Sequence, residues 1–350
     1  MYPLPNWRSP LRKDLERLTQ EVLEAKEKLV GLRKGTLVDD AFERVGYLTA
    51  KNFKVLNYPR DPLVAFNPSA VVKDGRVFMF TRFIFDYYGY VSSIGLSTFE
   101  LEKLENACCL NLSARLVIYP TTVHEVKRGA EDPRAHLYGD GFLVFYTAVG
   151  LKDGDLWPKQ GVAVLDENGE VVEKSVLRLG DVFPPSWKNT TMIRPEGRGL
   201  VILTRPWIEG HEVIWRATVD AEEWVVDPST MRVTLVPERF ELKVGVSTTP
   251  VKIGSDEYLI GWHAIMKDDL SYRNGLAVVN GDGELLGISE YLLYPKYIEE
   301  LYGDRPMVIY GCGLVKHKEY IYWIGGVADY GIGIYRAPLD KVMEHIKWLR

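Results

Sequence analysis

Residues 129–134 combine two carboxylates, a proline and an arginine directly before an apolar, aromatic run. The stretch reads Gly-Ala-Glu-Asp-Pro-Arg, and residues 141–146 read Gly-Phe-Leu-Val-Phe-Tyr. Pro133 fixes its own φ and disfavours helical backbone at Asp132, which limits the directions open to the Asp132 side chain. Arg134 can hold a carboxylate and favour its charged form. Local chemistry alone fits a salt-bridged turn as well as it fits a catalytic acid.

Four other places in the chain concentrate polar residues among apolar or aromatic ones. Each has an ordinary explanation when taken singly, because a strand-end arginine can extend to solvent and a histidine after a tryptophan is usually packed. Taken together, they supply several cationic and neutral hydrogen-bond donors and a second carboxylate. These residues are Asn67 and Arg82, then Lys188, Asn189 and Arg205, then His263, Tyr272 and Arg273, and finally Asp329.

Such a set suits a sugar beside an anion. Lysine, arginine, histidine and tyrosine donors can cradle a phosphate dianion, and the carboxylates of Asp132 and Asp329 come from other parts of the chain. Aromatic rings suit the apolar faces of sugars. The rings expected to do this are Tyr146, Trp187, Trp207 and Trp262.

The elements that must position these residues are short hairpins. From Asn67 onward, runs rich in Val, Ile, Phe and Tyr alternate with Asp-Gly, Asn-Gly and proline-containing turns. Polar residues end these runs roughly every 60 residues, a period typical of propeller blades. The sequence therefore predicts an all-β fold, a five-bladed β-propeller between about residues 67 and 336. A sandwich or a pair of jelly rolls is the alternative. The polar run ends are Arg82, Tyr146, Arg205, His263 and Asp329.

A helix is predicted at each end of the chain. Ser9 and Pro10 resemble an N-cap and a first helical residue, and apolar residues then recur at helical spacing up to Val30. This amphipathic helix could pack on its own domain or on another subunit, and the second use is favoured slightly. Residues 338–348 predict a short terminal helix. We therefore expect a helical extension over residues 1–40 and a single propeller domain over residues 41–350.

Composition excludes several classes of function. The 350-residue chain has a net charge of -5, which gives no broad basic surface for nucleic acid. It has neither a signal-peptide pattern nor an apolar run long enough to span a membrane. The three cysteines, Cys108, Cys109 and Cys312, favour a reducing compartment, and no Cys/His cluster has zinc spacing. A cytoplasmic protein without a metal or an organic cofactor is expected.

At the level of whole motifs, the sequence resembles glycoside hydrolase family 130, the β-mannoside phosphorylases and their hydrolytic relatives. Glu-Asp-Pro-Arg alone is short, but the ordered set of motifs across the chain is specific. The set comprises Phe66-Asn67-Pro68, Thr81-Arg82, residues 129–134 leading to Phe145-Tyr146-Thr147, Lys188-Asn189, Arg205-Pro206, Gly261-Trp262-His263, Tyr272-Arg273-Asn274-Gly275, Tyr310-Gly311-Cys312-Gly313 and residues 325–329.

The resemblance implies a five-bladed propeller and an inverting attack of inorganic phosphate on a β-mannoside, releasing α-mannose 1-phosphate. A phosphorylase needs one acid but no carboxylate base, because phosphate is already an anionic nucleophile. By motif order, Asp132 is the acid, acting through a sugar hydroxyl. Lys188, Arg205, His263, Tyr272 and Arg273 match phosphate-binding positions. The positions expected to bind substrate are Asn67, Arg82, Glu131, Arg134, Asn189 and Asp329.

The resemblance also leaves alternatives. Residues 85–90 and the segment around Cys108 match no family motif, which leaves the acceptor sugar open. Hydrolytic relatives carry acidic residues in place of the phosphate cradle, and Glu209 and Glu212 keep that activity open here. A non-catalytic sugar-binding propeller is a third reading. The expected partners are a β-mannoside oligosaccharide of the manno-oligosaccharide, mannosyl-glucose or mannosyl-N-acetylglucosamine type, inorganic phosphate and further copies of the chain in a homo-oligomer, with neither nucleic acid nor membrane.

Overall fold

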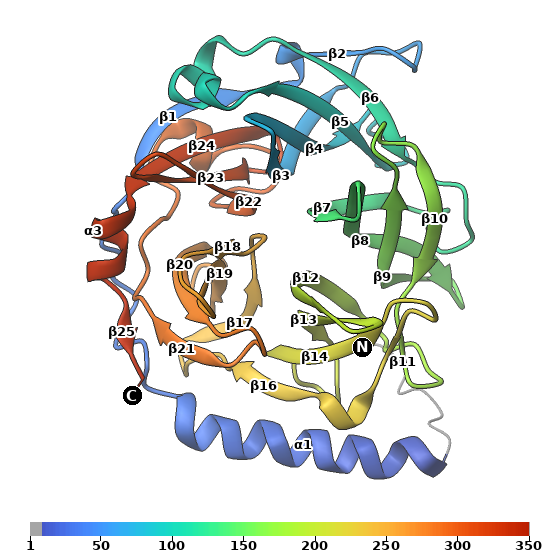
Figure 1. Cartoon of the computed structure of the whole chain (residues 1–350), viewed down its shortest axis with the longest axis vertical. Coiled ribbons are helices and arrows are strands. Elements are labelled where there is room, and N and C mark those ends of the chain that lie inside the picture. Colours follow the sequence, from blue (N-terminus) through green and yellow to red (C-terminus); the bar gives the residue numbers. More distant parts are fainter. Residues whose placement is uncertain (1–8, 350) are drawn as a thin grey trace.

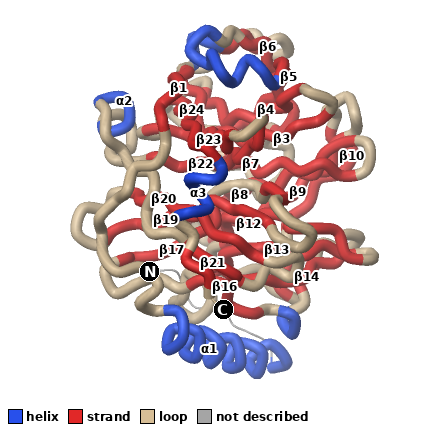
Figure 2. The backbone as a smooth tube through the Cα atoms, turned by 60° about the vertical axis from the view of Figure 1, so that its left-hand side comes forward, coloured by secondary structure: helices blue, strands red, loops and turns tan. Residues whose placement is uncertain are grey.

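A computed structural model describes residues 9–349 of the chain (Figures 1 and 2). The structure is mostly β, as the sequence predicts. Within the described residues the pairing gives four sheets. The first contains β1 (Glu43–Leu48), β22 (Ile309–His317), β23 (Tyr320–Val327) and β24 (Gly331–Pro338). The second contains β2 (Phe53–Val55), β3 (Val64–Lys73), β4 (Arg76–Ile84), β5 (Ser92–Glu100), β6 (Leu112–Ile118), β7 (Gly129–Tyr138), β8 (Gly141–Lys152), β9 (Asp155–Leu165) and β10 (Val171–Val176).

The other two sheets follow in chain order. The third contains β11 (Arg178–Leu179), β12 (Trp187–Glu196), β13 (Gly199–Pro206), β14 (Ile214–Asp220), β15 (Val225–Val226) and β16 (Arg232–Leu235). The fourth contains β17 (Glu241–Val246), β18 (Val251–Lys252), β19 (Tyr258–Met266), β20 (Tyr272–Val279), β21 (Leu285–Ile288) and β25 (Lys347–Trp348). The helices are α1 (Ser9–Leu29), α2 (Ile298–Leu301) and α3 (Leu339–Glu344), with 3-10 turns η1 (Ala50–Asn52), η2 (Leu101–Cys109) and η3 (Pro228–Thr230).

The sheets surround a central space (Figure 1). β3, β7, β12 and β22 lie toward the centre, and the later strands of each hairpin series lie further out. The second sheet is the largest because one parallel bridge, Ser92 to Gly129, joins β5 to β7. Gly129 has φ 77°, and a Cβ there would lie 2.0 Å from the Ser92 carbonyl oxygen, so this contact requires glycine. Apolar clusters fill the layers between neighbouring sheets.

The first sheet combines the two ends of the chain. β1 pairs antiparallel with β24, and the Arg336 guanidinium donates to the Glu43 carboxylate over 2.7 Å. Leu48 on β1 and Ile332 and Ile334 on β24 share one apolar cluster. This pairing joins the N-terminal strand to the C-terminal hairpin.

The register of three inner strands is interrupted at equivalent places. The pairing of β3 with β4 shifts between Phe66 and Ser69, that of β7 with β8 between Glu131 and Arg134, and that of β12 with β13 between Lys188 and Thr191. Each bulge contains one residue with left-handed backbone. These residues are Asn67 (φ 45°), Asp132 (φ 52°) and Asn189 (φ 62°). Asn and Asp tolerate this conformation better than other non-glycine residues, and bulges redirect side chains.

The helix α1 packs along its own chain. Leu15, Leu18 and Val22 are almost fully buried in the cluster that also contains Trp187 and Trp215 of the third sheet. The apolar face of α1 is therefore used within the chain, and the subunit contact favoured from the sequence is not made by that face. The predicted N-cap side chain of Ser9 lies outside the described side chains.

The C-terminal helix is shorter than predicted. α3 ends at Glu344, and Lys347 and Trp348 then pair with Ile288 and Gly287 of β21. The prediction of one helix to residue 348 was wrong because these last residues add a strand to the fourth sheet. The division into a helical extension and a single domain stays a prediction.

Candidate active site

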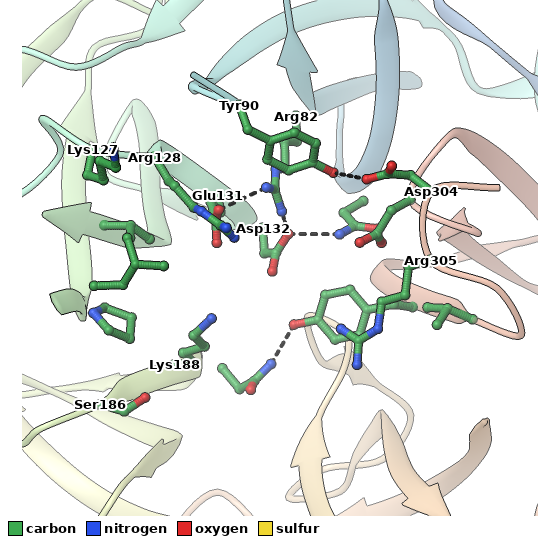
Figure 3. A pocket seen from close by; sticks show the side chains of 18 of the residues that line it. Arg82, Tyr90, Lys127, Arg128, Glu131, Asp132, Ser186, Lys188, Asp304 and Arg305 are labelled. Atoms are coloured by element: carbon green, nitrogen blue, oxygen red, sulfur yellow. Dashed lines mark hydrogen bonds and ion pairs between the residues drawn. The ribbon is translucent and has the colours of Figure 1, made fainter. Parts of the chain in front are cut away.

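A cavity of about 950 Å³ lies among the inner strands (Figure 3). Its wall brings together ten of the twelve residues predicted as site residues. They are Asn67, Arg82, Glu131, Asp132, Lys188, Asn189, Arg205, His263, Tyr272 and Asp329. The fold thus brings polar residues that are distant in the sequence into one cavity. Their individual roles stay predictions.

Asp132 lies at the middle of the cavity in a dense network (Figure 3). Its Oδ1 accepts hydrogen bonds from Arg82 Nη1 at 2.9 Å and from Asn67 Nδ2 at 2.8 Å. Arg82 also donates to Glu131 Oε1 at 2.9 Å and to Ser92 Oγ at 2.8 Å. Two backbone bulges and one arginine therefore fix the direction of the Asp132 carboxylate.

The Arg134 guanidinium is directed away from the Asp132 carboxylate, although its charge helps to lower the pKa of Asp132. Its guanidinium donates to the backbone oxygens of Val246 and Ser247 and, over 2.7 Å, to the Tyr310 hydroxyl. Arg134 is absent from the cavity lining and is 1% exposed. The bulge at Asp132 turns the two side chains apart, so Arg134 ties the inner end of β7 to β17 and β22.

The two aspartates of the cavity differ in acidity. Burial raises the pKa of Asp132, but the charge of Arg82, the Asn67 hydrogen bond and the charge of Lys188 outweigh it, leaving the pKa below its usual range. Burial also raises the pKa of Asp329, which stays at about 6 because the Asp132 charge partly offsets the effect of Arg82. In the free protein near neutral pH, Asp132 is ionised, and Asp329 titrates just below neutrality.

The opposite wall of the cavity is basic and less tightly paired. Lys188 and Arg205 are cross-strand partners on β12 and β13, a like-charge pair that is unfavourable without an anion. Glu212 is the nearest counter-charge, 3.7 Å from Arg205 Nε and 3.4 Å from Lys243 Nζ. Burial and the charge of Arg205 lower the pKa of Lys243 to about 8. Positive charge is therefore concentrated here beyond what Glu212 neutralises.

His263 and Tyr272 form the aromatic part of this wall. Their rings stack with centroids 5.3 Å apart, and His263 Nδ1 lies 2.8 Å from Ser247 Oγ. Burial, Arg205 and Arg134 lower the pKa of His263 well below its ordinary value, so the ring is neutral. In the tautomer in which Nδ1 accepts from the Ser247 hydroxyl, the imidazole proton is on Nε2, where it can donate.

Three polar atoms around the cavity are buried without a hydrogen-bond partner among the described residues. They are Asn67 Oδ1, Asn189 Oδ1 and Arg205 Nε. The residues themselves are only 2–5% exposed. Orphaned buried polar groups are costly and commonly mark a place that a ligand fills. Arg205 Nε lies 3.7 Å from Glu212 Oε1, whereas Asn67 Oδ1 lies against Gly326, where a Cβ would be only 1.8 Å away.

Some residues expected from the sequence to contact ligands lie outside the cavity lining. Arg273 is not among the lining residues, since its guanidinium bonds Ser271 Oγ and lies 3.7 Å from Asp269. Tyr146, Trp187 and Trp262 are core residues rather than sugar platforms. Tyr146 donates to Glu125, Trp187 donates to Thr204, and Trp262 packs against Tyr291. Of the four predicted rings, Trp207 lines the cavity.

Sequence reasoning also missed several lining residues. They include Tyr87, Tyr88, Tyr90, Lys127, Arg128, Ser186, Lys243, Asp304, Arg305 and Tyr310. Tyr310 lies in a recognised motif, so that motif could have indicated it. Lys243 lies on β17. The others come from loops outside the hairpin period, and no local pattern distinguishes them from surface residues.

Across residues 9–349 no three His, Cys, Asp or Glu side chains lie close enough together to hold an ion. Nor does any helix in this range have the length and hydropathy to cross a membrane.

A family model for glycoside hydrolase family 130, described as beta-1,4-mannooligosaccharide phosphorylase, matches residues 33–348. The chain belongs to this family. The match begins after α1 and spans all the cavity residues. No curated protein matches the sequence significantly.

Solved structures with the same fold share little sequence with the chain. A β-1,2-mannobiose phosphorylase from Listeria innocua, solved with β-1,2-mannobiose, has 16% identity and a TM-score of 0.62, covering 91% of this chain and 97% of its own. MPT-4, a mannose phosphorylase from Leishmania mexicana solved with phosphate, has 12% identity and a TM-score of 0.56, covering 93% and 94%. The family includes enzymes that act on mannosides as phosphorylases and others that act as hydrolases.

Proposed function

We propose that the protein is an inverting β-mannoside phosphorylase built on a five-bladed β-propeller. Inorganic phosphate, the co-substrate, attacks the anomeric carbon of a β-mannosyl unit and releases α-mannose 1-phosphate and the leaving sugar. The substrates are manno-oligosaccharides or mannosyl-glucose and mannosyl-N-acetylglucosamine units. Membership of family 130 and the mannoside-active relatives support this reaction class.

The observation that carries the proposal is the contrast between the two walls of one cavity. On one wall, Asn67 and Arg82 hold Asp132 at 2.8–2.9 Å. On the other, Lys188 and Arg205 are adjacent like charges, and Arg205 Nε has no hydrogen-bond partner among the described residues. A dianion beside Lys188 and Arg205 would satisfy charge and donors that the protein leaves unsatisfied.

The reaction needs one proton for the leaving oxygen. A phosphate oxygen forms a bond to the anomeric carbon as the bond to the leaving oxygen breaks, and Asp132 supplies the proton through a sugar hydroxyl. Because Asp132 is ionised in the free protein, it must gain its proton as the ligands bind. Phosphate favours this step, since it neutralises Lys188, one of the cations whose charge stabilises the carboxylate.

The remaining residues bind and orient the ligands. His263 and Tyr272 donate to phosphate, whereas Asn67, Arg82, Glu131, Asn189 and Asp329 contact the mannosyl unit. Arg134 acts indirectly by fixing the Tyr310 hydroxyl, which also accepts a hydrogen bond from Asn189.

Hydrolysis of β-mannosides is the second candidate, and one observation favours it. Glu212 lies in the cavity between Arg205 and Lys243, and these cations lower its pKa despite burial. An ionised carboxylate there could activate water as a base. Glu209, the other acid noted in the sequence, is not among the lining residues.

Product analysis with and without phosphate tests the two reactions. The purified protein is incubated with β-mannobioses of different linkage and with mannosyl-glucose, and sugar phosphates and free sugars are quantified. Phosphorolysis predicts mannose 1-phosphate in amounts equal to the leaving sugar, and little turnover without phosphate. Equal release of free mannose with and without phosphate, and no sugar phosphate, would establish hydrolysis instead.

A further inference from the structure

Residues 85–90, which match no family motif, form a tyrosine-rich segment at the edge of the cavity. The segment connects β4 to β5 and reads Phe-Asp-Tyr-Tyr-Gly-Tyr. Tyr87, Tyr88 and Tyr90 all line the cavity. Tyr88 is fully exposed and Tyr87 is 50% exposed, whereas Tyr90 is partly buried. Two large rings are thus held in solvent at the mouth of a polar site.

Both ends of this segment are anchored. At its start, the Phe85 ring packs against Tyr58 with centroids 4.7 Å apart, and Asp86 lies 3.4 Å from Arg60. At its end, the Tyr90 hydroxyl donates to Asp304 over 3.0 Å, which joins the segment to the loop after α2 (Figure 3). The tip with Tyr87 and Tyr88 is therefore supported from both sides, and the Tyr87 ring also lies beside the Tyr90 ring, with centroids 6.4 Å apart.

The segment lies on the leaving-group side of the cavity. Figure 3 shows Tyr90 and Arg128 on one side of Asp132, and Lys188 and Ser186 on the other. The Arg128 guanidinium lies 5.7 Å from the centre of the Tyr90 ring. In an inverting reaction the nucleophile and the leaving group occupy opposite faces of the anomeric carbon. If phosphate binds at Lys188, the leaving sugar departs toward Tyr90.

We propose that the tyrosine-rich segment is the leaving-sugar subsite, with Tyr87 and Tyr88 as stacking platforms for pyranose rings and Arg128 as a hydrogen-bond donor to their hydroxyls. The proposal rests on the proposed function, because it takes the position of Asp132 and of the phosphate from it. Tyrosine rings offer an apolar face with a polar edge, which suits a sugar. The segment would then determine which leaving sugars the enzyme accepts, and how many units bind.

The synthetic direction gives the sharpest test. With α-mannose 1-phosphate as donor and mannose, glucose, N-acetylglucosamine and β-mannobiose as acceptors, initial rates yield separate KM values for donor and acceptor. The variant Tyr87→Ala/Tyr88→Ala should raise the KM of the best acceptor about tenfold, the loss expected for a stacked ring. The KM of mannose 1-phosphate should change much less, because the residues proposed to bind its mannosyl and phosphate groups do not include Tyr87 or Tyr88.

Two variants control this experiment. Tyr88→Phe keeps the ring and should retain most of the acceptor affinity. Tyr297→Ala removes another half-exposed tyrosine that does not line the cavity, and it should behave as the wild type. An unchanged acceptor KM in the double variant, or an equal rise in the donor KM, would overturn the subsite.

The test of the leaving-sugar subsite can succeed or fail independently of the test for phosphorolysis. If the wild type hydrolyses mannosides without phosphate, phosphorolysis fails, and the same variants are compared on an oligosaccharide and on methyl β-mannoside. The subsite then predicts a raised KM for the oligosaccharide alone. Calorimetric binding of manno-oligosaccharide measures the same loss without turnover, and equal affinity of wild type and double variant would reject the subsite.

Discussion

The two walls of the cavity differ in how completely their charges are paired. Around Asp132, every close contact is a direct hydrogen bond of 2.8–2.9 Å, and Arg82 serves both Glu131 and Asp132. Around Arg205, the nearest carboxylate oxygens lie at 3.4–3.7 Å from the cations. The wall around Asp132 is hydrogen-bonded before any ligand arrives. The wall around Arg205 has positive charge that no close carboxylate neutralises.

This difference suggests that the wall around Asp132 orients the proton donor and that the wall around Arg205 binds the anion. A preassembled wall costs little reorganisation at the moment of reaction, which suits the group that transfers a proton. A wall with unsatisfied donors gains most when an anion enters it, which suits the co-substrate. Substitutions in the first wall should therefore affect turnover, and substitutions in the second should affect the use of phosphate.

The largest effect is expected on the preassembled wall. Asp132→Asn keeps the size of the side chain but removes the proton donor, and general acids contribute roughly 10²–10⁴-fold. We expect kcat to fall by about that factor while the melting temperature stays close to that of the wild type. Steady-state phosphorolysis and thermal unfolding measure the two. Asp140→Asn, in an exposed turn, is the control, and a loss below tenfold would assign the acid to another residue.

On the basic wall, Arg205→Ala should chiefly raise the KM for phosphate. Hydrogen bonds to charged groups contribute about 1.5–3 kcal/mol, or about 10–100-fold in affinity. Lys188→Ala should act in the same direction, and the KM for the mannoside should change much less. Phosphate titrations at fixed mannoside measure this, with the exposed Arg198→Ala on the same hairpin as control. An unchanged phosphate dependence would remove both residues from the cradle.

Glu212→Gln should have a smaller effect and one of opposite sign. The change removes the negative charge beside Arg205 and Lys243, so phosphate should bind several-fold more tightly and its KM should fall. In a hydrolase the same change would remove the base and abolish turnover. Glu209→Gln, in the same loop but outside the cavity lining, is the matched control. The sign of the Glu212→Gln effect therefore separates the two reactions.

The smallest effect concerns stability and Asp329. Burial raises the pKa of Asp329 to about 6 in the folded protein, compared with about 3.9 in an unfolded chain. The folded state therefore binds this proton more tightly, and its contribution to the free energy of unfolding falls as pH rises from about 4 to about 6. Asp329→Asn should remove that fall, a change of about 2–4 °C in Tm. Thermal unfolding across this pH range, with Asp153→Asn as control, measures the difference, and parallel curves for wild type and variant would contradict it.

The sequence predicted the site better than it predicted individual contacts. Hairpin period and motif order indicated residues from Asn67 to Asp329 that the fold brings into one cavity. The hydrogen bonds from Asn67 and Arg82 to Asp132 were not indicated, because these residues lie far from Asp132 in the sequence. A bulge with left-handed backbone at Asp132 turns neighbouring side chains apart, and nothing in the local sequence specifies a bulge.

Aromatic residues were the other weak point. Tyr146, Trp187 and Trp262 lie beside polar motifs in sequence but alternate into the core, since successive strand residues face opposite sides of a sheet. The rings that reach the cavity mouth come from the loop at residues 85–90. Loop residues show no regular alternation, so the direction of a loop side chain cannot be predicted from its position. Here it depends on contacts such as the Tyr90–Asp304 hydrogen bond, which joins residues more than 200 positions apart.

The pairing of β1 with β24 has a consequence for biosynthesis. Glu43 and Arg336 are 293 positions apart, so the first sheet cannot close until almost the whole chain has left the ribosome. Asp329 lies in the turn between β23 and β24, and it enters the cavity with that last hairpin. Until then, the edge of β1 that pairs with β24 is open to other chains. Translation stalled before residue 309 would therefore expose a partly built ring with Asp132 already in its bulge, but without the strands that complete its pocket.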